Sequence, residues 1–136
     1  MKNLFIDTNV LLDLLMERDG YQEAAIIMDM SGSTEFRLSV SVLSMSNIAY
    51  VLRKVLNSDE LYVALNKLSS FLHIVSVSSE DYFAAVKLRA RDFEDALQYF
   101  CAKSSGCDCI ITRNIKDFVF SDIPVVSSKN FLAENS

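Results

Sequence analysis

Short apolar runs, which predict buried strands, alternate along this 136-residue sequence with longer stretches whose apolar residues recur at helical spacing. The first run, Leu4 to Ile6, ends at Asp7, and the residues from Val10 to Leu15 then follow a helical pattern that we expect to end near residues 17 to 20. A ligand site commonly lies at the carboxyl end of a strand in an open α/β sheet, which makes Asp7 a candidate site residue. Asp7, Thr8 and Asn9 are also good helix-capping types, so a capping role for Asp7 stays open.

The same pattern predicts the remaining elements. Strands are expected at residues 36–40, 74–77, 109–112 and 124–126. Helices are expected at residues 21–30, 42–56, 60–72 and 79–89. A further helix opens at residue 92, and a small final helix ends at residue 132. The expected helix caps are Ser58 or Asp59, Ser79, and Ser127 or Ser128. Strands alternating with helices predict an α/β protein with a parallel sheet covered on both faces, and the length suits a single domain, residues 1–136.

Composition excludes several classes of protein. The apolar run after Lys2 is too short for a signal peptide, and no stretch approaches the roughly 18 apolar residues of a membrane span, so we expect a cytoplasmic protein without a membrane partner. Cys101, Cys107 and Cys109 have the spacing C-x5-C-x-C, which suits neither a disulfide framework nor a common zinc site. We expect these three side chains to be buried.

The net charge of -5 argues against binding nucleic acid through a broadly basic surface. It does not argue against a nuclease, because carboxylates that hold a divalent metal ion make a sequence acidic while the loaded site is far less so. Basic residues do gather late in the chain, where an ordinary solvated surface also explains them: Lys87, Arg89, Arg91, Lys103, Arg113 and Lys116.

Further acids follow the predicted strands at places where they could meet Asp7. The helix from residue 92 opens with the sequence D-F-E-D, and Thr112-Arg113-Asn114 and Asp117 follow the fourth strand. If the first and fourth strands are neighbours, these groups converge on one crevice. Acids in the first turn of a helix also suit the positive end of its dipole, so the structural explanation of Asp92, Glu94 and Asp95 stays open.

Three segments together resemble the PIN domain, in particular the bacterial branch that includes VapC-type toxins. They are I-D-T-N-V-L-L-D-L-L, D-F-E-D-A-L-Q-Y and D-C-I-I-T-R-N-I-K-D-F, and the resemblance covers nearly the whole chain. It implies a three-layer α/β/α fold with a five-stranded parallel sheet in the order 3-2-1-4-5. It also implies a pocket of three or four acids that binds Mg²⁺ or Mn²⁺ and hydrolyses RNA.

The resemblance assigns roles to individual residues. Asp7 corresponds to the first catalytic and metal-binding acid, and Asp95 corresponds to the acid on the helix before the fourth strand. Thr112-Arg113-Asn114 matches a T-R-[DN] segment in which many members have Asp at the position of Asn114. Asp117 is therefore the carboxylate left to serve as the last acid, with Asn114 as a neutral ligand or hydrogen-bond partner. The remaining matched positions would support the acids or contact the substrate: Thr8, Asn9, Asn47 and Thr112 as supporting residues, and Arg113 and Lys116 as substrate-binding residues.

One position departs from the family pattern. Asn47 stands on the helix from residue 42 where the second acid is expected. An amide oxygen can bind a hard cation but supplies no charge, so we expect weaker metal binding and attenuated or absent catalysis. Glu94, Asp92 and Asp13 are candidates to compensate, and the sequence does not choose among them.

The sequence therefore predicts a metal-dependent endoribonuclease, and the alternative is a PIN-fold module that binds RNA or protein without cutting. A haloacid-dehalogenase-type phosphatase is disfavoured because Asn9 replaces its second acid, and the lone His73 is expected to be structural. The resemblance further implies a homodimer and an antitoxin that inserts a carboxyl-terminal segment into the acidic pocket. Four apolar side chains could serve such contacts or belong to the core: Tyr50, Leu61, Tyr62 and Leu65.

Overall fold

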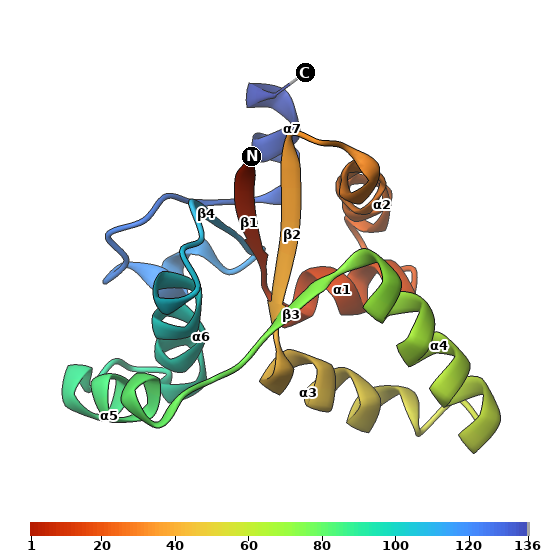
Figure 1. The fold of residues 1–136 in the computed structure, drawn as a ribbon, viewed down its shortest axis with the longest axis horizontal. Coiled ribbons are helices and arrows are strands. Elements are labelled where there is room, and N and C mark those ends of the chain that lie inside the picture. The colour runs from red at the N-terminus through yellow and green to blue at the C-terminus, as the bar shows by residue number, and fades with distance from the viewer. Residues whose placement is uncertain (136) are drawn as a thin grey trace.

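The fold is built on a five-stranded, all-parallel sheet in the order β3-β2-β1-β4-β5, as predicted (Figure 1). It is seen in a computed structural model that describes residues 1–135. The strands are β1 (Lys2–Ile6), β2 (Phe36–Ser41), β3 (His73–Val75), β4 (Cys109–Ile111) and β5 (Val125–Val126). Leu4, Phe5 and Ile6 of the central strand β1 are fully buried, so both faces of this strand are covered, as is usual for a parallel sheet.

Helices form a layer on each face of the sheet (Figure 1). The α-helices are α1 (Thr8–Leu15), α2 (Tyr21–Asp29), α3 (Val42–Leu52), α4 (Ser58–Phe71), α5 (Ser79–Leu88), α6 (Phe93–Ser104) and α7 (Ser128–Glu134), with short 3₁₀ turns η1 (Met30–Gly32) and η2 (Ile115–Phe118). Leu4 and Ile6 point into a core shared with α1 to α4 and α7, whereas Phe5 points into a second core against α6. Alternation of side chains along β1 thus serves two hydrophobic layers.

Several predicted boundaries differ from the observed ones. Helix α1 ends at Leu15, with Met16 as its C-cap, and α3 ends at Leu52 because the chain turns at Arg53. The N-cap of α4 is Asn57, where Ser58 or Asp59 was predicted, and the N-cap of α5 is Ser78, where Ser79 was predicted, so both predictions were wrong by one or two residues. Asn57 and Ser78 each form a capping box, in which the side chains of the cap and of the third helical residue each accept a hydrogen bond from the other's backbone N–H.

Smaller features agree with the sequence or refine it. The three cysteines are buried free thiols, as predicted. Strand β3 begins at His73, one residue earlier than predicted, and the His73 side chain is exposed. No helix within residues 1–135 is long and apolar enough to cross a membrane.

Candidate functional site

The register of the sheet brings Asp7 and Thr112 together. Ile6 pairs with Ile111, so the next residue of each strand leaves the sheet at the same level, and the Asp7 N–H donates to the Ile111 carbonyl over 3.0 Å. The Thr112 hydroxyl donates to Asp7 Oδ2 over 2.7 Å, and the Thr8 N–H donates to Asp7 Oδ1 over 2.9 Å. Both carboxylate oxygens are therefore oriented by neighbours.

Asp7 also caps helix α1, so the two interpretations of this residue from sequence are both compatible with the structure. The side chain is only 5% exposed, and burial raises the pKa of its carboxyl despite the hydrogen bonds that favour the charged form. A buried acid whose pKa is shifted by its surroundings is a typical feature of functional sites.

Asp7 lies on the wall of a cavity of about 230 Å³ at the carboxyl ends of β1 and β4. The lining side chains are mostly acids and amides: Asp7, Thr8, Asn9, Asp92, Glu94, Asp95, Gln98, Asn114 and Asp117. Six of the residues predicted from sequence as site residues are among them. We refer to this cavity as the acidic pocket.

Helix α6 places its first turn against the acidic pocket. Asp92 caps the helix by accepting the Asp95 N–H over 3.0 Å, so dipole stabilisation and pocket lining coexist in this segment. Burial, followed by repulsion from Asp7, Asp92, Asp117 and Glu94, raises the pKa of Asp95 to about 7. Burial and the surrounding negative charges together therefore disfavour the ionised form of Asp95.

Asn47 does not line the acidic pocket. Its side-chain amide on α3 donates to Glu94 Oε1 over 2.6 Å, and Glu94 is the residue that reaches the pocket wall. Of the three acids considered as replacements for the expected acid at position 47, Asp92 and Glu94 lie at the pocket.

Asp13, the third of those acids, lies elsewhere. It is 4% exposed and accepts a hydrogen bond from Arg113 Nη1 over 2.8 Å, with Arg18 at 4.0 Å. Burial raises the pKa of Asp13, and the two arginines oppose this. Arg113, expected from sequence to contact substrate, is therefore occupied by an internal ion pair.

A buried polar network behind the acidic pocket escaped the sequence analysis. Gln98, which is 1% exposed, accepts the Ser41 hydroxyl over 2.7 Å and donates to Ser44 Oγ over 2.7 Å and Thr8 Oγ1 over 3.2 Å. The hydroxyls of Ser44 and Thr8 are also 2.6 Å apart. The available signal was that Gln98 follows Asp95 by three residues and so shares its helix face.

The lining of the acidic pocket fits a hard divalent cation. Mg²⁺ and Mn²⁺ prefer carboxylate, amide and hydroxyl oxygens, which are the donors present, and a cation would offset the repulsion around Asp95. Within residues 1–135, no three acidic, histidine or cysteine side chains are already arranged around a single point as ligands of one ion.

The fold and the acidic pocket together define a class of α/β protein in which acids from the first and fourth strands and an intervening helix meet at one sheet edge. The chain belongs to the PIN domain family, whose model matches residues 3–116. This confirms the resemblance drawn from the three sequence segments.

Individual relatives cover nearly the whole chain. Ribonuclease VapC1 of Aquifex aeolicus (strain VF5) is 28% identical over 138 residues, which include 96% of this chain and 93% of that protein. A toxin-antitoxin complex from Klebsiella pneumoniae contains a chain with 26% identity and a TM-score of 0.69, covering 92% of this chain and 97% of that one. VapBC-1 from nontypeable Haemophilus influenzae has a TM-score of 0.74 at 17% identity, covering 93% and 98%, a likeness of fold.

Proposed function

We propose that this protein is a metal-dependent endoribonuclease of the VapC type. The observation that carries the proposal is the convergence of five acids around one cavity at the carboxyl edge of the sheet, with a buried and doubly hydrogen-bonded Asp7 among them. The kinship with Ribonuclease VapC1 supports RNA as the substrate.

In this proposal Asp7, Asp95 and Asp117 are the catalytic acids that hold Mg²⁺ or Mn²⁺. A bound divalent ion would supply an acidified water and offset charge on the phosphoryl oxygens. The protein's part is to fix the acids in place. Thr112 and the Thr8 backbone orient the Asp7 carboxylate, and Asn9 and Asn114 add neutral oxygen donors at the pocket wall.

Glu94 is our candidate for the acid that position 47 lacks. The Asn47 amide holds one Glu94 oxygen by a 2.6 Å hydrogen bond, while Glu94 lines the pocket from the first turn of α6. The negative charge expected on α3 is thus supplied by α6. On this view Asn47 positions an acid, and catalysis is less attenuated than its substitution alone would imply.

The partners are also proposals. Structural relatives include toxin–antitoxin complexes, which supports a cognate antitoxin as a partner. A cytoplasmic location is part of the same proposal. A homodimer remains a prediction. Tyr50 and Tyr62 are exposed and available for either contact, whereas Leu61 and Leu65 are half-buried against the core.

The test is cleavage of a defined structured RNA with Mn²⁺ or Mg²⁺, using protein freed of any co-purified antitoxin. We expect the native protein to cut and Asp7→Ala to be inactive, with Asp59→Ala, which removes an exposed acid on α4, as the matched control. Glu94→Gln should lower activity if Glu94 serves as the additional acid. Cleavage by Asn47→Glu alone would instead favour the alternative, a catalytically weak PIN module whose function is binding.

A further inference from the structure

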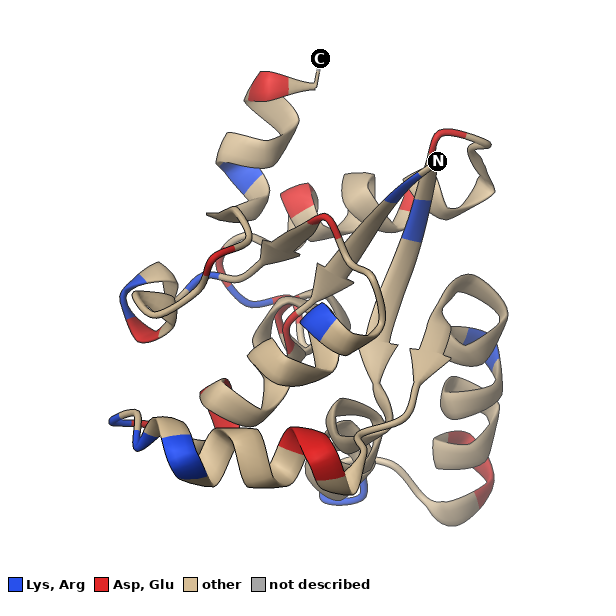
Figure 2. Cartoon of the chain, turned by 60° about the vertical axis from the view of Figure 1, so that its left-hand side comes forward, with Lys and Arg blue, Asp and Glu red and all other residues tan. Residues whose placement is uncertain are grey.

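A second cavity opens beside the acidic pocket. It has a volume of about 520 Å³ and shares Asp92 and Asp117 with the acidic pocket, so the two form a continuous surface. Its other lining residues are Leu88, Ala90, Arg91, Lys116, Val119 and Phe120. Its two cations, Arg91 and Lys116, thus equal the two shared acids in number, and we call it the basic cleft after the cations, which the acidic pocket lacks. Figure 2 shows that its two basic segments, the connection after α5 and the turn η2, lie on the same side of the molecule.

The cations of the basic cleft are available to a ligand. The side chains of Arg91 and Lys116 are exposed, and neither forms a hydrogen bond or ion pair with another residue in the described part of the chain. Arg113 differs, because its guanidinium is engaged with Asp13. In a chain with net charge -5, two unpaired cations beside an acidic site are well placed to bind phosphate groups on either side of the reacting one.

The basic cleft also offers apolar surface. Val119 is 85% exposed and Leu88 is 38% exposed, so both present hydrocarbon to the solvent. Single-stranded nucleic acid is usually bound by cations, which contact its phosphates, together with aromatic side chains, which contact its base faces. In this cleft the exposed aliphatic side chains offer the apolar surface for a base. A base inside a duplex is stacked and cannot enter a concave site of this kind.

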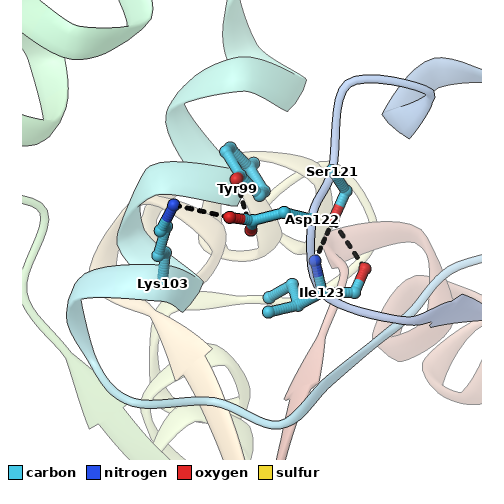
Figure 3. Close-up of polar contacts among 5 residues, drawn as sticks. All are labelled: Tyr99, Lys103, Ser121, Asp122 and Ile123. Carbon is cyan, nitrogen blue, oxygen red and sulfur yellow. Dashed lines mark hydrogen bonds and ion pairs between the residues drawn. The ribbon is translucent and has the colours of Figure 1, made fainter.

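The wall formed by Val119 and Phe120 is held in place without a ligand. Figure 3 shows that Asp122 accepts hydrogen bonds from the Tyr99 hydroxyl, at 2.6 Å, and from the Lys103 ammonium group, at 2.7 Å. The Phe120 ring meets the Tyr99 ring edge-on with centroids 5.3 Å apart. The segment after η2 is therefore fixed to α6, and the cleft is largely formed in advance, as small-ligand sites usually are.

We infer that the basic cleft binds an unpaired RNA segment next to the scissile phosphate, with Arg91 and Lys116 on the backbone and Val119 against a base. The inference rests on the proposed nuclease function of the acidic pocket. It assigns substrate binding to Arg91 and Lys116 in place of Arg113.

Binding is measured by fluorescence anisotropy with a short, unstructured, fluorescein-labelled RNA in EDTA, so that no metal-dependent cleavage occurs. The double variant Arg91→Ala Lys116→Ala should bind about tenfold more weakly or worse, as expected for the loss of two charge-assisted contacts. The slope of log affinity against log salt should fall by about 1.4, from ~0.7 for each lost phosphate contact with a single strand.

The matched control is Arg37→Ala Lys129→Ala, which removes the same charges from exposed positions on β2 and α7 outside the cleft. Val119→Ser should weaken binding with an unchanged salt slope, because it removes apolar contact only. The inference would be overturned if Arg91→Ala Lys116→Ala bound RNA with the same affinity and salt slope as the control variant. It would also be overturned if the native protein did not bind the RNA.

The cleft and the nuclease can fail separately. If the native protein binds RNA through the cleft but never cuts with Mn²⁺, the inference about binding stands and the proposed activity fails. If the native protein cuts, and the cleft variant cuts with unchanged KM and binds with unchanged affinity, the nuclease stands and the cleft is refuted.

Discussion

Replacing Gln98 by leucine tests whether the buried network behind the acidic pocket stabilises the fold. The change keeps the side chain near its original size and removes three hydrogen bonds, to Ser41 and Ser44 at 2.7 Å each and to Thr8 at 3.2 Å. At about 1 kcal/mol net for each bond, the loss is about 3 kcal/mol.

The remaining contacts of the network limit further loss. Ser44 keeps its 2.6 Å contact with Thr8, and Ser41 keeps its hydrogen bonds with the hydroxyl and backbone N–H of Ser44. Because no hydroxyl is left without a partner, and because leucine adds apolar burial, we expect a net destabilisation of about 2 to 3 kcal/mol.

Urea unfolding followed by circular dichroism measures this difference, with an unchanged m-value as the sign that only stability has changed. Gln22→Leu is the matched control, since Gln22 is exposed on α2 and its replacement should change stability by less than about 0.5 kcal/mol. A loss below about 1 kcal/mol for Gln98→Leu would refute the reasoning, because the network would then contribute little beyond apolar packing.

Three further predictions follow from the site. Folding raises the pKa of Asp95 from 3.8 to about 7, so the folded state favours the protonated carboxyl. The stability that this protonation contributes is complete below pH 3.8 and is lost as the pH rises through 7. Without metal, the urea midpoint of the native protein should therefore fall between pH 5 and pH 8 by more than that of Asp95→Asn. Arg113→Ala should destabilise by about 2 kcal/mol in urea unfolding, less than for a fully buried pair because the Arg113 side chain is 46% exposed, and an effect no larger than that of Arg37→Ala would contradict this. Thr112→Val removes the 2.7 Å hydrogen bond to Asp7 and the 3.0 Å hydrogen bond from the Asn114 N–H, and should weaken Mn²⁺ binding measured by calorimetry, whereas equal affinity would show that the pocket needs neither contact to bind the ion.

Much of the fold could be predicted because its signals are local. The apolar run that ends at Asp7, the helical spacing after it and the polar residues after Ile111 each lie within a few positions of one another. Strand and helix periodicity is a property of such neighbours. The order of the strands came from the family resemblance, and the helix caps at Asn57 and Ser78 were missed because adjacent polar residues compete for the same role.

The sequence by itself thus determined the α/β class and the membership of the acids in three short segments. Only the tertiary structure decided the partners of individual side chains: Glu94 for Asn47, Asp13 for Arg113, and Ser41 for Gln98, pairs that are 47, 100 and 57 positions apart. Each of these choices depends on how two separately encoded helices, strands or loops pack against each other. Periodicity shows which face of an element is buried, but it does not show which side chain of another element lies opposite.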